Sequence, residues 1–166
     1  LFCSVIQAAI PESMPGNTEY VRDTSIATGI SRGVARLMRN LDTDCLFEFK
    51  LRTRRRADVI GLGRDGGFTI VEIKSSLADY RADSKWPDYT GFCDRFYFAV
   101  PPNFPVRILP NGCGIIFADG FGGEIIRPAP ALPMNAARRR ALTLLFARTA
   151  ATRLMRVTDR PFNAGL

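Results

Sequence analysis

The sequence predicts a single α/β domain in which an amphipathic helix precedes three strands and a second long helix follows near the C-terminal end. A chain of 166 residues is long enough for one domain with a sizeable core and too short for two ordinary ones. Hydrophobic residues make up 46% of it and charged residues 23%, which is typical of a globular protein. We expect the domain to span residues 24–160, with a loosely ordered leader over 1–23 and a short tail over 161–166.

The first predicted element is a helix over residues 26–41, because its apolar residues recur every three or four positions. Three strand-like runs follow at 45–51, 56–62 and 68–74, and a glycine-rich turn joins the last two. We interpret residues 75–93 as a loop leading into a short helix with proline in its first turn.

The second half begins with an apolar, aromatic run over residues 95–100, which is typical of a buried strand. Shorter strands are predicted at 106–109, 114–117 and 124–127, separated by Asn-Gly and Gly-Gly pairs. Residues 134–155 are rich in alanine and leucine and contain no glycine or proline, which predicts the second long helix. The element order is therefore αβββαβ, followed by small strands and a helix.

The chain contains no histidine, which excludes Ser-His-Asp and Cys-His nucleophiles and zinc sites that use imidazole. Its four cysteines form no C-x-x-C pair, so we interpret them as structural thiols in a reducing cytoplasm. The apolar stretch over residues 1–10 is too short to span a bilayer, and no membrane partner is expected. The remaining possibilities are catalysis by carboxylate and lysine side chains, or a binding function without catalysis.

The net charge is +7, and 20 of the 23 cationic residues are arginine. Arginine is well suited to forked contacts with phosphate, so an anionic partner is expected. Residues 134–166 hold seven cations and one anion, which concentrates the excess at the C-terminal end. The alternative is a solvated basic helix with no partner.

Candidate catalytic residues lie on the second and third predicted strands. Glu72 and Lys74 share one face of a strand, about 7 Å apart along it. Asp58 falls opposite Glu72 if the hairpin through the glycine-rich turn is in register. Two carboxylates would offer hard oxygen ligands to Mg²⁺ or Mn²⁺, and a neighbouring lysine can act on a metal-bound water. The alternative is a surface ion pair between Asp58 and Lys74.

Two other strings compete with these assignments. An acid stands two positions before every lysine, at Glu48, Glu72 and Asp83, but only Glu72 combines a buried strand with an acid on its hairpin partner. Gly61 to Gly66 matches the G-x-G-x-x-G string of dinucleotide-binding folds. Because a strand follows it where that motif requires a helix, we interpret it as a hairpin turn.

Two groups of arginines are candidates for phosphate contacts. Arg54, Arg55 and Arg56 lead directly into Asp58, where they would attract a polyanion or simply form a solvated strand edge. On the C-terminal helix, one stripe is predicted for Arg138, Arg153 and Arg156. That stripe would contact several phosphates, or serve only as a solubilising surface.

Several of these segments together resemble the MmcB-like DNA repair proteins of bacteria. They are R-R-A-D ending at Asp58, V-E-I-K-S-S around Glu72 and Lys74, Lys85-Trp with Tyr89, and C-D-R-F-Y-F-A-V-P from residue 93. The layout also resembles the PD-(D/E)XK nuclease superfamily. The resemblance covers residues 24–160 and implies a restriction-endonuclease-like αβββαβ core with a mixed central sheet flanked by helices.

The resemblance further implies roles for particular residues. Asp58 and Glu72 would be metal ligands, Lys74 the catalytic lysine and Glu48 a further acid at the site. Lys85 and Tyr89, one helical turn apart, would be accessory residues.

We therefore expect a DNA repair protein that hydrolyses DNA phosphodiesters with Mg²⁺ or Mn²⁺, with a second copy of the chain or other repair proteins as protein partners. Many members of the superfamily carry an acid on the first core helix, and residues 26–40 contain none. The alternative is accordingly a non-catalytic DNA-binding module on the same scaffold.

Overall fold

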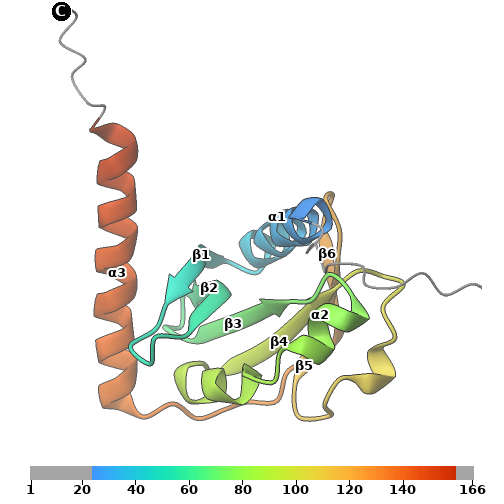
Figure 1. Cartoon of the computed structure of the whole chain (residues 1–166). Helices are drawn as coiled ribbons and strands as arrows, with labels where there is room; N and C mark the ends of the chain where they lie inside the picture. The colour runs from blue at the N-terminus through green and yellow to red at the C-terminus, as the bar shows by residue number, and fades with distance from the viewer. Residues whose placement is uncertain (1–23, 160–166) are drawn as a thin grey trace, which may run out of the picture.

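The computed structural model describes residues 24–159. The leader expected over 1–23 and the tail expected over 161–166 lie outside the described residues. The centre of the fold is a six-stranded mixed sheet flanked by helices, consistent with a restriction-endonuclease-like fold (Figure 1). In chain order the elements are α1 (Thr24–Asn40), β1 (Thr43–Lys50), β2 (Arg56–Gly63), β3 (Phe68–Ile73), α2 (Leu77–Ala82), the 3₁₀ helix η1 (Trp86–Phe92), β4 (Arg95–Val100), the 3₁₀ helix η2 (Val106–Ile108), β5 (Gly114–Ala118), β6 (Gly123–Arg127) and α3 (Ala136–Thr158).

The strands lie in the sheet in the order in which they occur in the chain. β1, β2 and β3 form the predicted antiparallel meander, β4 and β5 run parallel to β3, and β6 is antiparallel to β5. Parallel neighbours need a crossover, because a tight turn cannot join them. The crossover from β3 to β4 contains α2 and η1, and it brings α2 beside the end of β3 (Figure 1).

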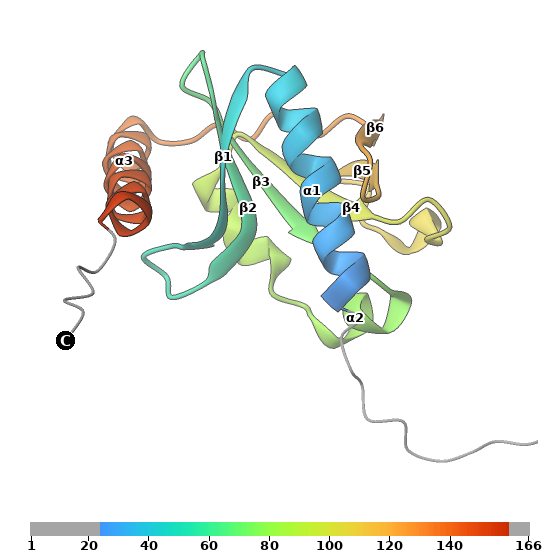
Figure 2. The same ribbon diagram turned by 90° about the horizontal axis from the view of Figure 1, so that it is seen from above.

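Each face of the sheet has its own hydrophobic core. α1 covers one face through Ile30, Val34 and Met38, which pack with Val71 and Tyr97. On the other face a larger cluster joins η1 and the first half of α3 to the sheet. Figure 2 shows α1 crossing the sheet and α3 standing beside β1. No helix within residues 24–159 is both long and apolar enough to cross a membrane.

The hairpin turn between β2 and β3 confirms the interpretation of the glycine-rich string. Gly66 has a φ of 75°, in the left-handed region that favours glycine. Oδ1 of Asp65 accepts a hydrogen bond of 2.9 Å from the backbone N–H of Gly67. Phe68 then begins β3, so no helix follows the string.

Two predicted elements were wrong. Residues 77–82, expected as loop, form α2, whose first turn is capped because the Ser76 hydroxyl accepts from the Asp79 N–H. This Ser-x-x-Asp capping pattern was the available signal. Residues 106–109, expected as a strand, form η2 instead. Val106 and Leu109 both pack on the core, and a spacing of three suits a 3₁₀ turn, whereas a strand would put them on opposite faces.

Candidate active site

The register of the β2–β3 hairpin brings two carboxylates to one end of the sheet. Val59 pairs with Val71, which places Asp58 opposite Glu72, as predicted. The Asp58 carboxylate also accepts a hydrogen bond of 2.8 Å from the Ile73 N–H. Val71 and Ile73 pack in the core beneath α1, so Glu72 projects from the opposite face.

Glu72 is 4% exposed. Burial, followed by the nearby negative charge of Asp58, raises the pKa of Glu72 from 4.5 to about 8. Within the described residues, Oε2 of Glu72 is buried without a hydrogen-bond partner. Buried polar atoms are normally satisfied, so this oxygen is an unfilled acceptor in the site.

Lys74 follows β3 directly, and its side chain is fully buried. Its Nζ lies 2.8 Å from Oδ2 of Asp83 and 3.3 Å from Oε1 of Glu72. Burial alone would lower the pKa of Lys74, but the hydrogen bond to Asp83 and the charges of both carboxylates outweigh it and raise that pKa. The buried lysine is therefore cationic.

Asp83 is a further residue of this site, which was not among the predicted site residues. It is the C-cap of α2, and its Oδ1 accepts a hydrogen bond of 2.9 Å from the Lys85 N–H. Burial opposes ionisation of Asp83, but the hydrogen bonds from Lys74 and the Lys85 backbone prevail and lower its pKa. Its signal in the sequence is the acid-x-lysine spacing of Asp83 and Lys85, which lies in the segment expected as a loop.

The two predicted accessory residues have different environments. Tyr89 is buried, its ring stacks on Phe96 with centroids 6.2 Å apart, and its hydroxyl donates to the Arg56 carbonyl at 3.0 Å. Burial, and then the charges of Glu72 and Asp58, raise the pKa of Tyr89, which places the phenol close to the acids. Lys85 is exposed. Residues 86–92 form a 3₁₀ helix with three residues per turn, so a spacing of four does not align Lys85 with Tyr89.

The donor set at this end of the sheet fits a hard divalent cation. Glu72 has an unpartnered buried oxygen, and Asp58 is close enough to raise the pKa of Glu72. Mg²⁺ commonly binds one or two carboxylates and keeps several waters. No group of three or more potential ligands is present among residues 24–159, so such an ion would rely on two protein ligands.

Glu48 lies on β1 at a backbone irregularity. Its φ is 48°, which is uncommon for a residue other than glycine. Leu46 and Phe49 both pack on the same core although strict alternation would separate them. The Glu48 side chain is 52% exposed and forms an ion pair of 2.6 Å with Arg56. The structure thus joins Glu48 to the start of β2 at the protein surface.

The predicted DNA-binding arginines also have partners or surroundings that the sequence did not reveal. Arg55 pairs with Asp88 at 2.7 Å, and Arg54 lies exposed in the β1–β2 turn. On α3, Arg138 donates to the Gly91 carbonyl at 2.7 Å, and Arg153 donates to the carbonyls of Phe47 and Glu48 at 2.6 and 3.1 Å. Both α3 arginines therefore face the domain and dock the helix. Arg156, near the end of α3, lines a groove between the helix and β1.

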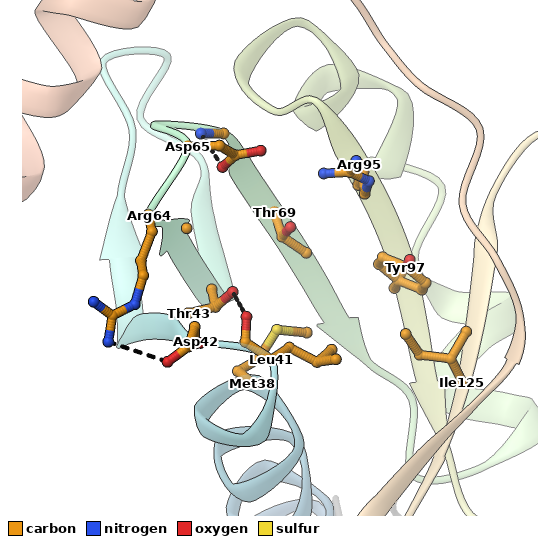
Figure 3. A pocket seen from close by; sticks show the side chains of 12 residues that line it. Met38, Leu41, Asp42, Thr43, Arg64, Asp65, Thr69, Arg95, Tyr97 and Ile125 are labelled. Carbon is orange, nitrogen blue, oxygen red and sulfur yellow. Dashed lines mark hydrogen bonds and ion pairs between the residues drawn. The ribbon is translucent and has the colours of Figure 1, made fainter.

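A cavity of about 450 Å³ lies on the face of the sheet that α1 partly covers (Figure 3). Its two arginines are balanced by two aspartates, and one pair, Arg64 and Asp42, is joined at 3.2 Å. Tyr97, which lines it, belongs to the core under α1, whereas Glu72 projects from the opposite face. The cavity has no net charge that would select a ligand, and it is separated from the acidic site by the sheet.

The fold and the site together define an α/β protein with a buried carboxylate–lysine cluster at the end of a β-hairpin. The chain belongs to the family described as DNA repair protein MmcB-like, whose profile matches residues 16–161. It is similar to a solved structure of a protein of unknown function from Silicibacter pomeroyi, with 40% identity and a TM-score of 0.78 over 87% of this chain and 98% of that chain. No curated protein matches it.

Proposed function

We propose that the protein hydrolyses phosphodiester bonds of DNA with a divalent metal ion, as part of DNA repair. The observation that carries this proposal is the buried Glu72 carboxylate, which has an unpartnered oxygen, a neighbouring acid and a cationic lysine in contact. Membership of a DNA repair family supports DNA as the substrate. The basic turn that leads into Asp58 would offset the repulsion between the acids and phosphate.

Asp58 and Glu72 would hold Mg²⁺ or Mn²⁺, which when bound supplies Lewis acidity and lowers the pKa of water. Lys74 brings a fixed positive charge to the same place. An ammonium has three donors, and the carboxylates of Asp83 and Glu72 account for two of them. Because the side chain is fully buried, Lys74 would act through its charge, which would stabilise negative charge that develops on the phosphate in the transition state.

In this proposal Tyr89 positions the backbone of β2 and does not contact the substrate. Its hydroxyl holds the Arg56 carbonyl at the start of β2, two residues before Asp58. The ring of Phe96 stacks on the Tyr89 ring and restricts its orientation. Tyr89 would therefore set the position of Asp58, and Lys85 would contribute its backbone N–H to Asp83.

A non-catalytic DNA-binding module remains the second candidate. The observation that favours it is the absence of any acidic residue in α1, over residues 24–40. Such a module would keep the hairpin and its ion pairs for stability, and it would bind DNA equally well with and without a metal ion.

The deciding experiment incubates the protein with plasmid, single-stranded and branched DNA in Mg²⁺, in Mn²⁺ and in EDTA. Cleavage that needs the metal and is lost in Glu72→Gln supports the hydrolase. A matched variant, Glu124→Gln, removes an exposed acid at the far edge strand β6 and should cleave normally. Binding without cleavage of any of these substrates would support the second candidate.

A further inference from the structure

A groove of about 380 Å³ lies between β1 and the second half of α3. β1 is an edge strand of the sheet, and α3 stands beside it (Figures 1 and 2). Arg153 fixes the spacing between the two elements, because its guanidinium donates to the carbonyls of Phe47 and Glu48. The two walls of the groove, β1 and α3, are therefore held at a fixed distance from each other.

Cationic and hydroxyl side chains line this groove from both walls. The helix contributes one face, at spacings of three and four residues, and the strand contributes the residues around its irregularity. The described lining residues are Glu48, Lys50, Leu145, Arg148, Thr149, Thr152, Arg153 and Arg156. Four cations thus face one acid, and none of these lining residues is aromatic.

The single acid in the groove, Glu48, already has a cationic partner. Glu48 pairs with Arg56 at 2.6 Å, and both side chains are more than half exposed. Arg56 stands two residues before Asp58 on β2, which is about 7 Å along an extended strand. This ion pair therefore links a residue of the groove to the strand that carries Asp58.

We propose that the groove holds the sugar–phosphate backbone of DNA, and that Glu48 is the counter-ion that a phosphate replaces on Arg56. Cations and hydroxyls bind phosphate oxygens, whereas base stacking requires aromatic side chains. Binding is therefore independent of base sequence and depends strongly on salt. This inference deepens the proposed function, because it routes the substrate from α3 to Asp58, and it gives Glu48 a role in binding in place of one in chemistry.

The test measures fluorescence anisotropy of a labelled DNA duplex in EDTA, where no metal-dependent cleavage occurs, over a series of salt concentrations. One variant combines Lys50→Gln, Arg148→Gln and Arg156→Gln and leaves the docking residue Arg153 intact. Its control combines Arg32→Gln, Arg39→Gln and Arg107→Gln, which removes the same charge from exposed positions on α1 and η2. The groove variant should bind more weakly and lose about one unit of salt slope per cation removed. The control should retain most of the wild-type slope.

The variant Glu48→Gln provides the sharper test, because the counter-ion role fixes the direction in which DNA affinity should change. As a counter-ion, Glu48 competes with phosphate, so its neutralisation should tighten DNA binding up to about fivefold, the scale of one exposed ion pair. Glu124→Gln, with the same charge change on the far edge strand, should change affinity less.

Three results would overturn the proposal that DNA binds in this groove. They are equal effects of the groove and control triples, weaker binding by Glu48→Gln, and tighter binding of labelled polyglutamate than of DNA. The binding assay is separate from the proposed hydrolysis. If the groove variants weaken DNA binding but the wild type cleaves no DNA, the result supports the groove as a DNA-binding site and rejects the proposed hydrolase activity. If the wild type cleaves DNA and the triple groove variant binds DNA like its control, the result rejects the groove as a DNA-binding site and supports the hydrolase activity.

Discussion

Lys74 and Asp83 form an ion pair of 2.8 Å that joins the end of β3 to the C-cap of α2. The lysine side chain is 1% exposed and the aspartate side chain 22%, so water screens the pair only in part. Because the pair ties the crossover to the sheet, it holds both the buried ammonium and the C-terminal end of α2 in place.

Asp83→Asn should therefore destabilise the fold by about 1.5–3 kcal/mol, the range for a hydrogen bond to a charged group. Urea unfolding measures this change. The control is Asp88→Asn, which breaks the exposed pair with Arg55 and should cost less than about 1 kcal/mol. Equal losses in the two variants would show that the Lys74–Asp83 pair adds no more than a surface bridge.

Lys74→Ala should abolish cleavage and largely preserve DNA binding, because the lysine acts on charge in the transition state. Circular dichroism verifies that the variant is folded, and single-turnover kinetics at saturating DNA measure the chemical step. Lys50→Ala, in the groove, should show the opposite pattern of weaker binding with an unchanged saturating rate. Cleavage by Lys74→Ala at the wild-type rate would reject the role of this lysine.

Stability in EDTA should fall as the pH rises from about 5 to 8. The pKa of Glu72 is near 8 in the folded state and near 4.5 when the group is exposed. The folded state therefore binds more protons across this window, and its advantage is lost as the pH passes through the higher value. The chain has no histidine, so other side chains contribute little between these limits. The difference between wild type and Glu72→Gln isolates this effect, and a difference that grows in favour of the wild type with rising pH would contradict it.

Mg²⁺ should raise the melting temperature of the wild type at pH 8.5, and by less at pH 6. A metal ion binds the ionised carboxylate, so protons on Glu72 compete with it. Thermal unfolding with and without Mg²⁺ measures the shift. Glu72→Gln and Asp58→Asn should lose it, whereas Glu124→Gln should keep it. The same shift in Glu72→Gln as in the wild type would place the ion elsewhere.

The central hairpin and the face that carries its acids could be predicted from the sequence alone. Side chains alternate along a strand, and a tight glycine turn fixes the register, so Glu72, Lys74 and the position of Asp58 opposite Glu72 followed from local rules. The helix periods of α1 and α3 were equally local. Each of these predictions needed only residues that are neighbours in the chain or across one turn.

The partners that those residues contact depend on how distant parts of the chain pack together. Asp83 reaches Lys74 because the crossover folds α2 back on the end of β3. Glu48 turns toward Arg56 because its left-handed backbone breaks the alternation that the sequence implied. The angular positions of Arg138 and Arg153 on α3 were predictable, but the carbonyls that they bind belong to η1 and β1. Such contacts depend on how segments far apart in the chain pack together, and periodicity within one segment carries no information about that packing.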